Sequence, residues 1–322
     1  ATGAIPLTDP ATPGTLLIAA VLVLTIAGAT QDIAIDAYTI GLLAPGEEGV
    51  GNGVRVSAYR AALIASGGGL LLLAGRGGWP LAFNVAALLF VGLAVAAWRA
   101  PHHPIARQPA AAWARSFVAW LARPGAFAVL LFIVLYKLAD VSMGPMVKPF
   151  WLDSGLTIDD VALVSTTAGV GLTIAGALAG GIFTSRFGIF HGLWVLGLLQ
   201  AASNLGYAGA AASGGGRPAI YAASMLESFT GGLGTAAFLA FLMHVCEREQ
   251  AATQYALLSS LFGLTRSVSA PFTGVGATHF GYATYFALTF FLAFPAYALL
   301  PWIRPWIHDR TPRCIIASEP AP

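Results

Sequence analysis

The chain has 322 residues, of which 57% are hydrophobic and only 9% are charged, and its formal net charge is +2. A soluble domain carries about 25% charged residues, so this composition excludes an ordinary soluble enzyme and indicates a helical membrane protein. The small net charge gives no reason to expect a nucleic-acid partner. The two cysteines, Cys246 and Cys314, form no close pair in the sequence and argue against a disulfide scaffold or a cysteine metal site.

Apolar stretches of about 20 residues recur along the chain and predict an all-α fold. Each stretch is long enough to cross a hydrocarbon core of about 30 Å at about 1.5 Å per residue. A transmembrane barrel would instead show ~10-residue strands of alternating polarity, and the sequence has no such pattern. The nine predicted spans are Thr15–Ile40, Val56–Ala74, Trp79–Trp98, Gly125–Val147, Asp160–Phe183, Phe190–Ala212, Ala219–Val245, Thr253–Ala277 and Tyr282–Ile303.

One connection between the predicted spans, residues 99–123, is long and basic. It contains Arg99, Arg107, Arg115 and Arg123 and no acidic residue. Because Lys and Arg concentrate in cytoplasmic loops, we interpret this segment as a cytoplasmic linker between two helix bundles. The predicted organisation is the last three spans of a truncated N-terminal bundle in residues 1–98, the linker in 99–123, a complete six-span bundle in 124–308 and a cytoplasmic tail in 309–322.

A cytoplasmic linker preceded by three spans places the N-terminus outside the cell. Residues 1–14 carry no Lys or Arg and no cleavable signal pattern. We therefore expect that an odd number of spans, most economically three, precedes this sequence in the complete protein. The alternative is a genuine nine-span protein with an exported N-terminus.

Charged side chains inside the predicted spans are the first functional candidates, because a charge at the centre of a membrane helix costs about 2.5–3.5 kcal/mol on insertion scales. The first two, Asp32 and Asp36, lie one helical turn apart on the same face. Two neighbouring carboxylates raise each other's proton affinity, which suits a proton-binding site. Alternatively, both lie at the wet end of the span and pair with Arg55 or Arg60. The seven candidates are Asp32, Asp36, Arg60, Lys137, Asp140, Glu227 and Arg266.

The second charged pair is Lys137 and Asp140, which are three residues apart and can meet on one helix face. Lysine shifts its pKa readily when it is buried, so the pair is a candidate for proton coupling. A self-neutralising structural pair is the alternative.

The later spans supply candidates for substrate binding. Glu227 is followed by a glycine-rich run that leaves a polar groove in front of its carboxylate, and Arg266 can hold a substrate carboxylate by two parallel bonds. A structural bridge between these two side chains is the alternative. Gln200, Asn204 and Tyr207 form a stripe that can bind sugar hydroxyls or amides, or can join membrane helices together.

Enzyme signatures are missing from the sequence. It contains no Ser/His/Asp triad pattern, no HExxH motif and no Walker motif. We therefore expect a protein that is not an enzyme and needs neither a cofactor nor a metal.

The turn after the fifth predicted span resembles a motif of the major facilitator superfamily. It reads Gly181-Ile-Phe-Thr-Ser185-Arg186-Phe187-Gly188, which is similar to the G-x-x-x-D-R-F-G turn of that superfamily. The resemblance implies a two-bundle fold in which Gly181, Ser185 and Arg186 belong to a gating turn. Ser185 stands where the superfamily usually has aspartate, so the charge pair that the aspartate forms is in doubt here.

A narrower resemblance covers the chain up to about Ile303. Five runs look like AmpG-type muropeptide permeases, in that family's order and spacing: Ala29–Tyr38, Val134–Asp140, Leu198–Tyr207, Glu227–Met243 and Ala252–Arg266. By residue match, the family's polar intramembrane positions are occupied by Asp32, Asp36, Tyr59, Arg60, Lys137, Asp140, Asn204, Glu227 and Arg266.

The resemblance implies proton-coupled import of anhydro-muropeptides across the bacterial inner membrane for peptidoglycan recycling. Asp32, Asp36, Lys137 and Asp140 would couple protons, and the substrate-binding residues would be Tyr59, Arg60, Gln200, Asn204, Tyr207, Glu227 and Arg266. The expected partners are a sugar-peptide, protons and the lipid bilayer, and the expected state is a monomer. The alternatives are a transporter of another amphipathic solute, such as an acyl-CoA-like molecule or a peptide, and a non-transporting truncated fragment.

Overall fold

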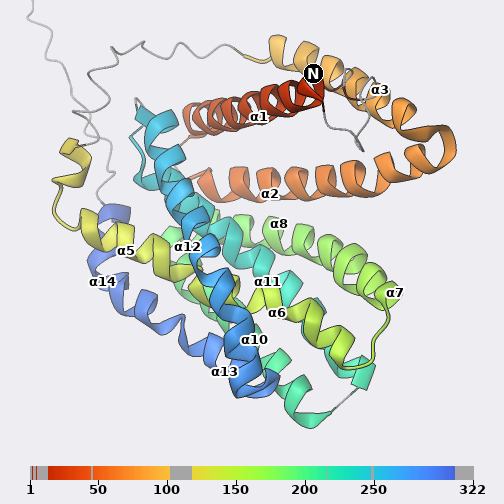
Figure 1. The fold of residues 1–322 in the computed structure, drawn as a ribbon. Coiled ribbons are helices and arrows are strands. Elements are labelled where there is room, and N and C mark those ends of the chain that lie inside the picture. Colours follow the sequence, from red (N-terminus) through yellow and green to blue (C-terminus); the bar gives the residue numbers. More distant parts are fainter. Residues whose placement is uncertain are drawn as a thin grey trace, which may run out of the picture.

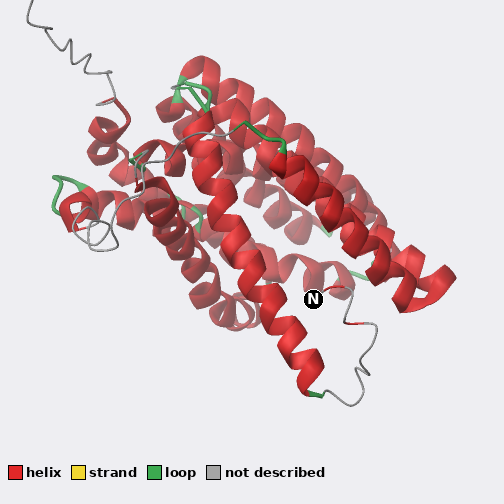
Figure 2. Cartoon of the chain, turned by 90° about the horizontal axis from the view of Figure 1, so that it is seen from above, coloured by secondary structure: helices red, strands yellow, loops and turns green. Residues whose placement is uncertain are grey.

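The computed structural model describes residues 2, 5, 14–44, 46–101, 118–214, 216–247 and 250–308. Within these residues the chain folds into helices and contains no strand (Figures 1 and 2). The predicted all-α fold is therefore confirmed. Most of the predicted linker, residues 102–117, and the predicted tail from residue 309 lie outside the described part.

The first group of helices precedes the linker and comprises α1 (Thr15–Leu42), α2 (Glu48–Ile64) and α3 (Leu70–Trp98). A π-helical segment, η2 (Ala65–Gly69), joins α2 to α3. The chain reverses at Gly78, where a φ of 77° breaks the helical geometry of α3, a conformation that glycine adopts readily. α2 begins at Glu48, well before the predicted Val56, because its first turns carry polar residues that hydropathy alone does not assign to a span.

The second group follows the linker and forms a tighter bundle (Figure 1). Its predicted first span is broken in two at Lys137, and its other spans follow the predicted order. The elements are α5 (Ala126–Tyr136), α6 (Leu138–Asp153), α7 (Ile158–Asp160), η3 (Val161–Ala168), α8 (Gly169–Phe187), α9 (Ile189–His191), η4 (Gly192–Leu196), α10 (Gly197–Ser213), α11 (Gly216–Val245), α12 (Ala251–Phe280), α13 (Tyr282–Phe291) and α14 (Phe294–His308).

Six helical segments of the described chain are long and apolar enough to cross a membrane. They are Thr15–Leu42, Leu72–Trp98, Ala126–Asp153, Ile158–Phe187, Gly216–Val245 and Tyr282–Ile307. The other three predicted spans are helical as well, in α2 with η2, in α9 to α10, and in α12, but they are not among these six. Polar side chains such as Arg60, Gln200 and Arg266 lie on these three.

The two groups of helices meet where α2 packs along α8 (Figure 1). A side chain at Gly181 of α8 would collide with the backbone of Gly49 and Gly53 in α2, so only glycine allows the two helices to lie so close. On its other side α8 packs against α11, again through small residues. α8 is thus held between the first group and the interior of the second.

The core of the second group is aromatic. Phe132 and Tyr136 of α5 lie against Phe241 and Phe238 of α11, with ring centroids 5.3 Å apart in both pairs. Phe132, Phe238 and Phe241 are fully buried. This packing fixes the end of α5 against α11 directly before the helix break at Lys137.

Candidate functional site

Lys137 is buried at the break between two helices. α5 ends at Tyr136 and α6 begins at Leu138, and Lys137 between them has φ −95° and ψ 2°. Its ammonium donates hydrogen bonds to Gln200 Oε1 at 2.9 Å and to Thr235 Oγ1 at 3.0 Å. The nearest carboxylate oxygen, Asp140 Oδ2, is 3.6 Å from Nζ. The Lys137–Asp140 pair that the sequence suggests is therefore formed, but neutral groups of α10 and α11 lie closer to the ammonium.

Two more charged side chains, Glu227 of α11 and Arg60 of α2, lie close enough to Lys137 to interact with it electrostatically. Asp140 in turn acts on Glu227. We call Arg60, Lys137, Asp140 and Glu227 the Lys137 cluster. Its two cations and two anions balance, and they come from both groups of helices, which places the cluster at the junction of the two. Mutual neutralisation is what allows so many charges to lie in a membrane-spanning bundle.

The polar stripe of α10 is divided between two roles. Gln200 reaches the Lys137 cluster. Asn204 instead donates to Thr289 Oγ1 of α13 at 3.0 Å, and Tyr207 is fully buried with its ring centroid 5.5 Å from that of Phe286. In this structure Asn204 and Tyr207 join α10 to α13, as the packing interpretation of the stripe predicts.

A second charged cluster ties α1, α2 and α12 together. Arg55 of α2 forms an ion pair with Asp36 of α1, and it donates a hydrogen bond to the Tyr255 hydroxyl of α12 at 2.8 Å. The guanidinium also lies over the Tyr255 ring, 5.4 Å from its centroid. Asp36 is buried, whereas Asp32 is exposed and acts on both Asp36 and Arg55 only electrostatically. Of the two interpretations of Asp36, pairing with Arg55 is the one that this structure displays.

The predicted gating turn touches the first group of helices. The Ser185 hydroxyl accepts a hydrogen bond from the Val50 N–H at 3.0 Å, in the first turn of α2, where backbone donors have no partner within the helix. Gly181 provides the close approach to α2, and Arg186 is exposed with its guanidinium 5.5 Å from the centroid of the Phe187 ring. Ser185 thus caps α2 with a neutral hydroxyl in place of a carboxylate.

Glu48 and His244 form another contact between the two groups that the sequence analysis missed. His244 Nδ1 of α11 is 3.5 Å from Glu48 Oε1 at the start of α2, and His244 Nε2 is 3.0 Å from the Ile307 carbonyl oxygen of α14. Tyr255 and Thr235 were missed as well, whereas Arg55 was named only as a possible partner of the two aspartates. No single signal marks these residues, because each gains its meaning only from a partner far away in the sequence.

Two predicted substrate-binding residues lie outside these clusters. Tyr59 is 63% exposed, and Arg266 is exposed and forms no ion pair with any residue that the structure describes. The structural bridge between Arg266 and Glu227 is therefore not formed in this conformation.

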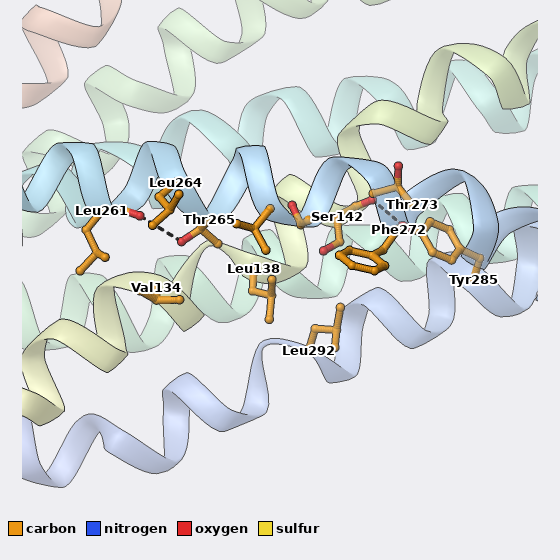
Figure 3. A pocket seen from close by; sticks show the side chains of 12 residues that line it. Val134, Leu138, Ser142, Leu261, Leu264, Thr265, Phe272, Thr273, Tyr285 and Leu292 are labelled. Atoms are coloured by element: carbon orange, nitrogen blue, oxygen red, sulfur yellow. Dashed lines mark hydrogen bonds between the residues drawn. The ribbon is translucent and has the colours of Figure 1, made fainter.

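A cavity of about 460 Å³ opens along α12, where it faces α5, α6 and the end of α13 (Figure 3). Its wall combines leucine and phenylalanine side chains with a few hydroxyl groups, and no charged residue lines it. One of these hydroxyls, that of Tyr285, already donates to the Ser142 carbonyl oxygen at 2.6 Å. None of the predicted site residues contributes to this cavity.

The all-helical fold and the membrane-length helices define a multi-pass membrane protein. Its two groups of helices, together with the relatives below, make it one of the major facilitator type. No protein-family model matches the chain. The anhydromuropeptide permease of Escherichia coli K12 is 33% identical over 298 residues, which are 91% of this chain and 61% of the permease. An uncharacterized protein of Haemophilus influenzae is 32% identical over 319 residues, which are 94% of this chain and 75% of that protein. A Rickettsia conorii transporter named AmpG 4 is 27% identical over 285 residues, or 85% of this chain and 69% of the transporter.

The chain belongs to the family of AmpG-type permeases. It spans 61% of the length of the Escherichia coli relative, less than two thirds.

Proposed function

We propose that the chain takes part in proton-coupled import of anhydro-muropeptides across the bacterial inner membrane, in the recycling of peptidoglycan. The observation that carries the proposal is the Lys137 cluster, where ionisable groups of both helix groups meet next to polar side chains. Charges inside membrane bundles mark ion and substrate pathways. Discontinuous helices such as α5–α6 form binding sites between the moving halves of many transporters. The relatives named as permeases support the same assignment.

Within this proposal, Asp32, Asp36, Lys137 and Asp140 are the proton-coupling residues. Arg60, Glu227 and Arg266 bind the substrate together with Tyr59 and Gln200. Muropeptides carry free carboxylates on their peptide stem, and the exposed Arg266 has no anionic partner among the described residues. Rocking of α2 against α8, with their small residues in contact, would alternate access to the site.

The experiment is uptake of a labelled anhydro-muropeptide into proteoliposomes under an imposed pH gradient. We expect accumulation that a protonophore abolishes. Asp140→Asn should lose accumulation while it still binds the ligand, and the control Asp159→Asn, which changes an exposed carboxylate, should behave as wild type. Accumulation that persists without a pH gradient would contradict proton coupling.

The substrate role of Arg266 has its own test. Arginine holds a carboxylate by two bonds and lysine does not, so Arg266→Lys should weaken binding of the intact muropeptide by about 1–3 kcal/mol. A ligand without stem carboxylates should be bound equally by both proteins. Equal losses for the two ligands would show that Arg266 does not read the carboxylate.

The orientation in the membrane is also part of the proposal. The Lys and Arg bias places residues 148–159 outside the cytoplasm and the linker and C-terminus inside. In a background without the two native cysteines, a cysteine at Ser154 should react with an impermeant thiol reagent in intact cells, and one at Gln108 should not. The reverse pattern would overturn the orientation.

A further inference from the structure

The orientation of the Gln200 carboxamide is fixed by Lys137. An ammonium group can only donate hydrogen bonds, so the Gln200 atom that lies 2.9 Å from Lys137 Nζ must be the oxygen. The amide nitrogen, Nε2, therefore points elsewhere. It is buried and has no hydrogen-bond partner among the described residues, and Gln200 as a whole is only 5% exposed. An unpaired buried donor is costly, which makes it an unusual feature in a well-packed bundle.

Two glycines of α11 explain where this nitrogen points. A side chain at Gly234 would collide with Gln200 Oε1, so glycine at that position is what lets Gln200 reach Lys137. A β-carbon at Gly231 would lie 4.0 Å from Gln200 Nε2 and 3.7 Å from Glu227 Oε1, with no other outside atom within 4 Å. Gly231 thus leaves room for a small group, and a hydrogen-bond donor and an acceptor both border that room. We call this space the Gly231 slot.

Gln200 Nε2 forms no hydrogen bond with Glu227 or with any other described residue, so it is available to a third group. The Glu227 carboxylate interacts with the Ser228 side chain, but its two oxygens can accept more than one hydrogen bond. That group must accept from the amide nitrogen and donate to the carboxylate. A secondary amide does both, through a carbonyl oxygen and an N–H that are separate atoms on opposite edges. A hydroxyl also donates and accepts, but it does so through a single oxygen, whereas the amide brings a separate atom to each partner.

We infer that the Gly231 slot binds a secondary amide of the substrate, with the amide oxygen on Gln200 Nε2 and the amide N–H on Glu227. This inference rests on the proposed function and specifies how the same site recognises its ligand. In a muropeptide, such an amide is present both in the acetamido groups of the two sugars and in the bonds of the stem peptide. Lys137 takes no direct part in this contact and acts as a positioning residue that orients Gln200.

The test fills the slot without disturbing the fold. In Gly231→Ala the added methyl lies in ordinary van der Waals contact with its neighbours, and alanine is a better helix former than glycine. The matched control is Gly209→Ala in α10, where a β-carbon would meet no atom within 4 Å. Binding to the purified chain is measured for two probes, the peptide-free anhydro-disaccharide with both acetamido groups and the free stem peptide.

If the slot binds an acetamido group, we expect Gly231→Ala to weaken binding of the disaccharide by about tenfold or more. Binding of the stem peptide should then be unchanged. The reverse pattern would assign the slot to a peptide bond. Gln200→Glu keeps an oxygen for Lys137 and removes the N–H donor, so it should weaken the same probe.

If Gly231→Ala binds both probes as tightly as the wild type and the Gly209→Ala control do, the inference is overturned. The proposed function still stands in that case. The same holds if Gln200→Glu alone loses affinity, because Gln200 would then serve only Lys137. A wild-type chain that binds neither probe nor the intact muropeptide would contradict the proposed function itself.

Discussion

The two charged clusters satisfy their charges in different ways. Arg55 forms a direct ion pair with Asp36, and its side chain is still 29% exposed. Lys137 has a side chain that is only 2% exposed, and its nearest partners are the neutral oxygens of Gln200 and Thr235. One cation is thus paired with a full negative charge at a wet junction. The other is solvated by neutral groups in the interior.

The difference indicates different roles. A direct ion pair at a partly exposed junction joins helices, and in this case it links α1, α2 and, through Tyr255, α12. A lysine held by neutral oxygens does not use up the carboxylates around it. Asp140 pairs with Lys137 only at 3.6 Å and is 31% exposed, and Glu227 forms no ion pair among the described residues. Both carboxylates can therefore still meet a proton or a ligand, which suits a binding site better than a structural tie.

Replacing Lys137 should have the largest effect. Lys137→Met leaves Asp140 and Glu227 with less positive charge nearby and takes the donor away from Gln200 Oε1. Removal of one partner from a buried ionic group typically costs about 3–5 kcal/mol. The free energy of unfolding in detergent, measured with a denaturant, should fall by this amount.

The double variant Lys137→Met with Asp140→Leu separates stability from coupling. It removes the pair together, so it should recover most of the lost stability. If the pair couples protons, the recovered protein should still fail to accumulate substrate under a pH gradient. Full recovery of accumulation would show that the pair is structural, and the contrast between the two clusters would disappear.

Tyr255 tests the junction cluster with an intermediate effect. Its hydroxyl accepts a hydrogen bond from a charged guanidinium, so Tyr255→Phe should cost about 1.5–3 kcal/mol. Tyr285→Phe is the control, because the Tyr285 hydroxyl donates to a neutral carbonyl and its loss should cost about 0.5–1.5 kcal/mol.

A double-mutant cycle of Tyr255→Phe with Arg55→Met should show coupling between the two residues, measured by denaturant unfolding. Equal costs for Tyr255→Phe and Tyr285→Phe, with no coupling to Arg55, would mean that the junction cluster does not tie α12 to α2.

How far the sequence could predict this molecule depends on the range of the interaction. The helices follow from runs of apolar residues, and the Lys137–Asp140 pair follows from a spacing of three on one helix. The break at Lys137 carries no glycine or proline of its own, and nothing local announces it. The partners Gln200 and Thr235 lie on other helices, so only the packing of α10 and α11 against α5 brings them to the lysine.

The junction cluster shows the same limit. Arg55 precedes the predicted span, so the sequence suggests it only as one of two possible partners for the aspartates. Tyr255 carries no charge at neutral pH, and no sequence pattern marks it as a partner of Arg55. Asp36 and Asp32 look equivalent in the sequence, with one helical turn between them, yet Asp36 is buried beside Arg55 and Asp32 is exposed. Burial is decided by the neighbouring helices, which spacing within one helix does not reveal.

Replacing Ser185 should have the smallest effect on stability. It tests the contact between α8 and the start of α2, where Ser185 accepts a hydrogen bond from the Val50 N–H. Ser185→Ala removes the hydrogen bond from the Val50 N–H and should lower the free energy of unfolding by about 0.5–1.5 kcal/mol.

Ser185→Asp would place a carboxylate at the positive end of α2, where a negative charge stabilises a helix by about 0.3–1 kcal/mol. The first turn of α2 already contains Glu48, however, and Glu48 and Ser185 border the same pocket. Repulsion between the two carboxylates should offset the gain. The expected result is therefore little change for Ser185→Asp alone and a clear gain in the unfolding free energy when the same change is made in a Glu48→Gln background. Equal effects of Ser185→Asp in both backgrounds would show that residue 185 does not sense the charge of Glu48, and that the serine acts only as a local cap.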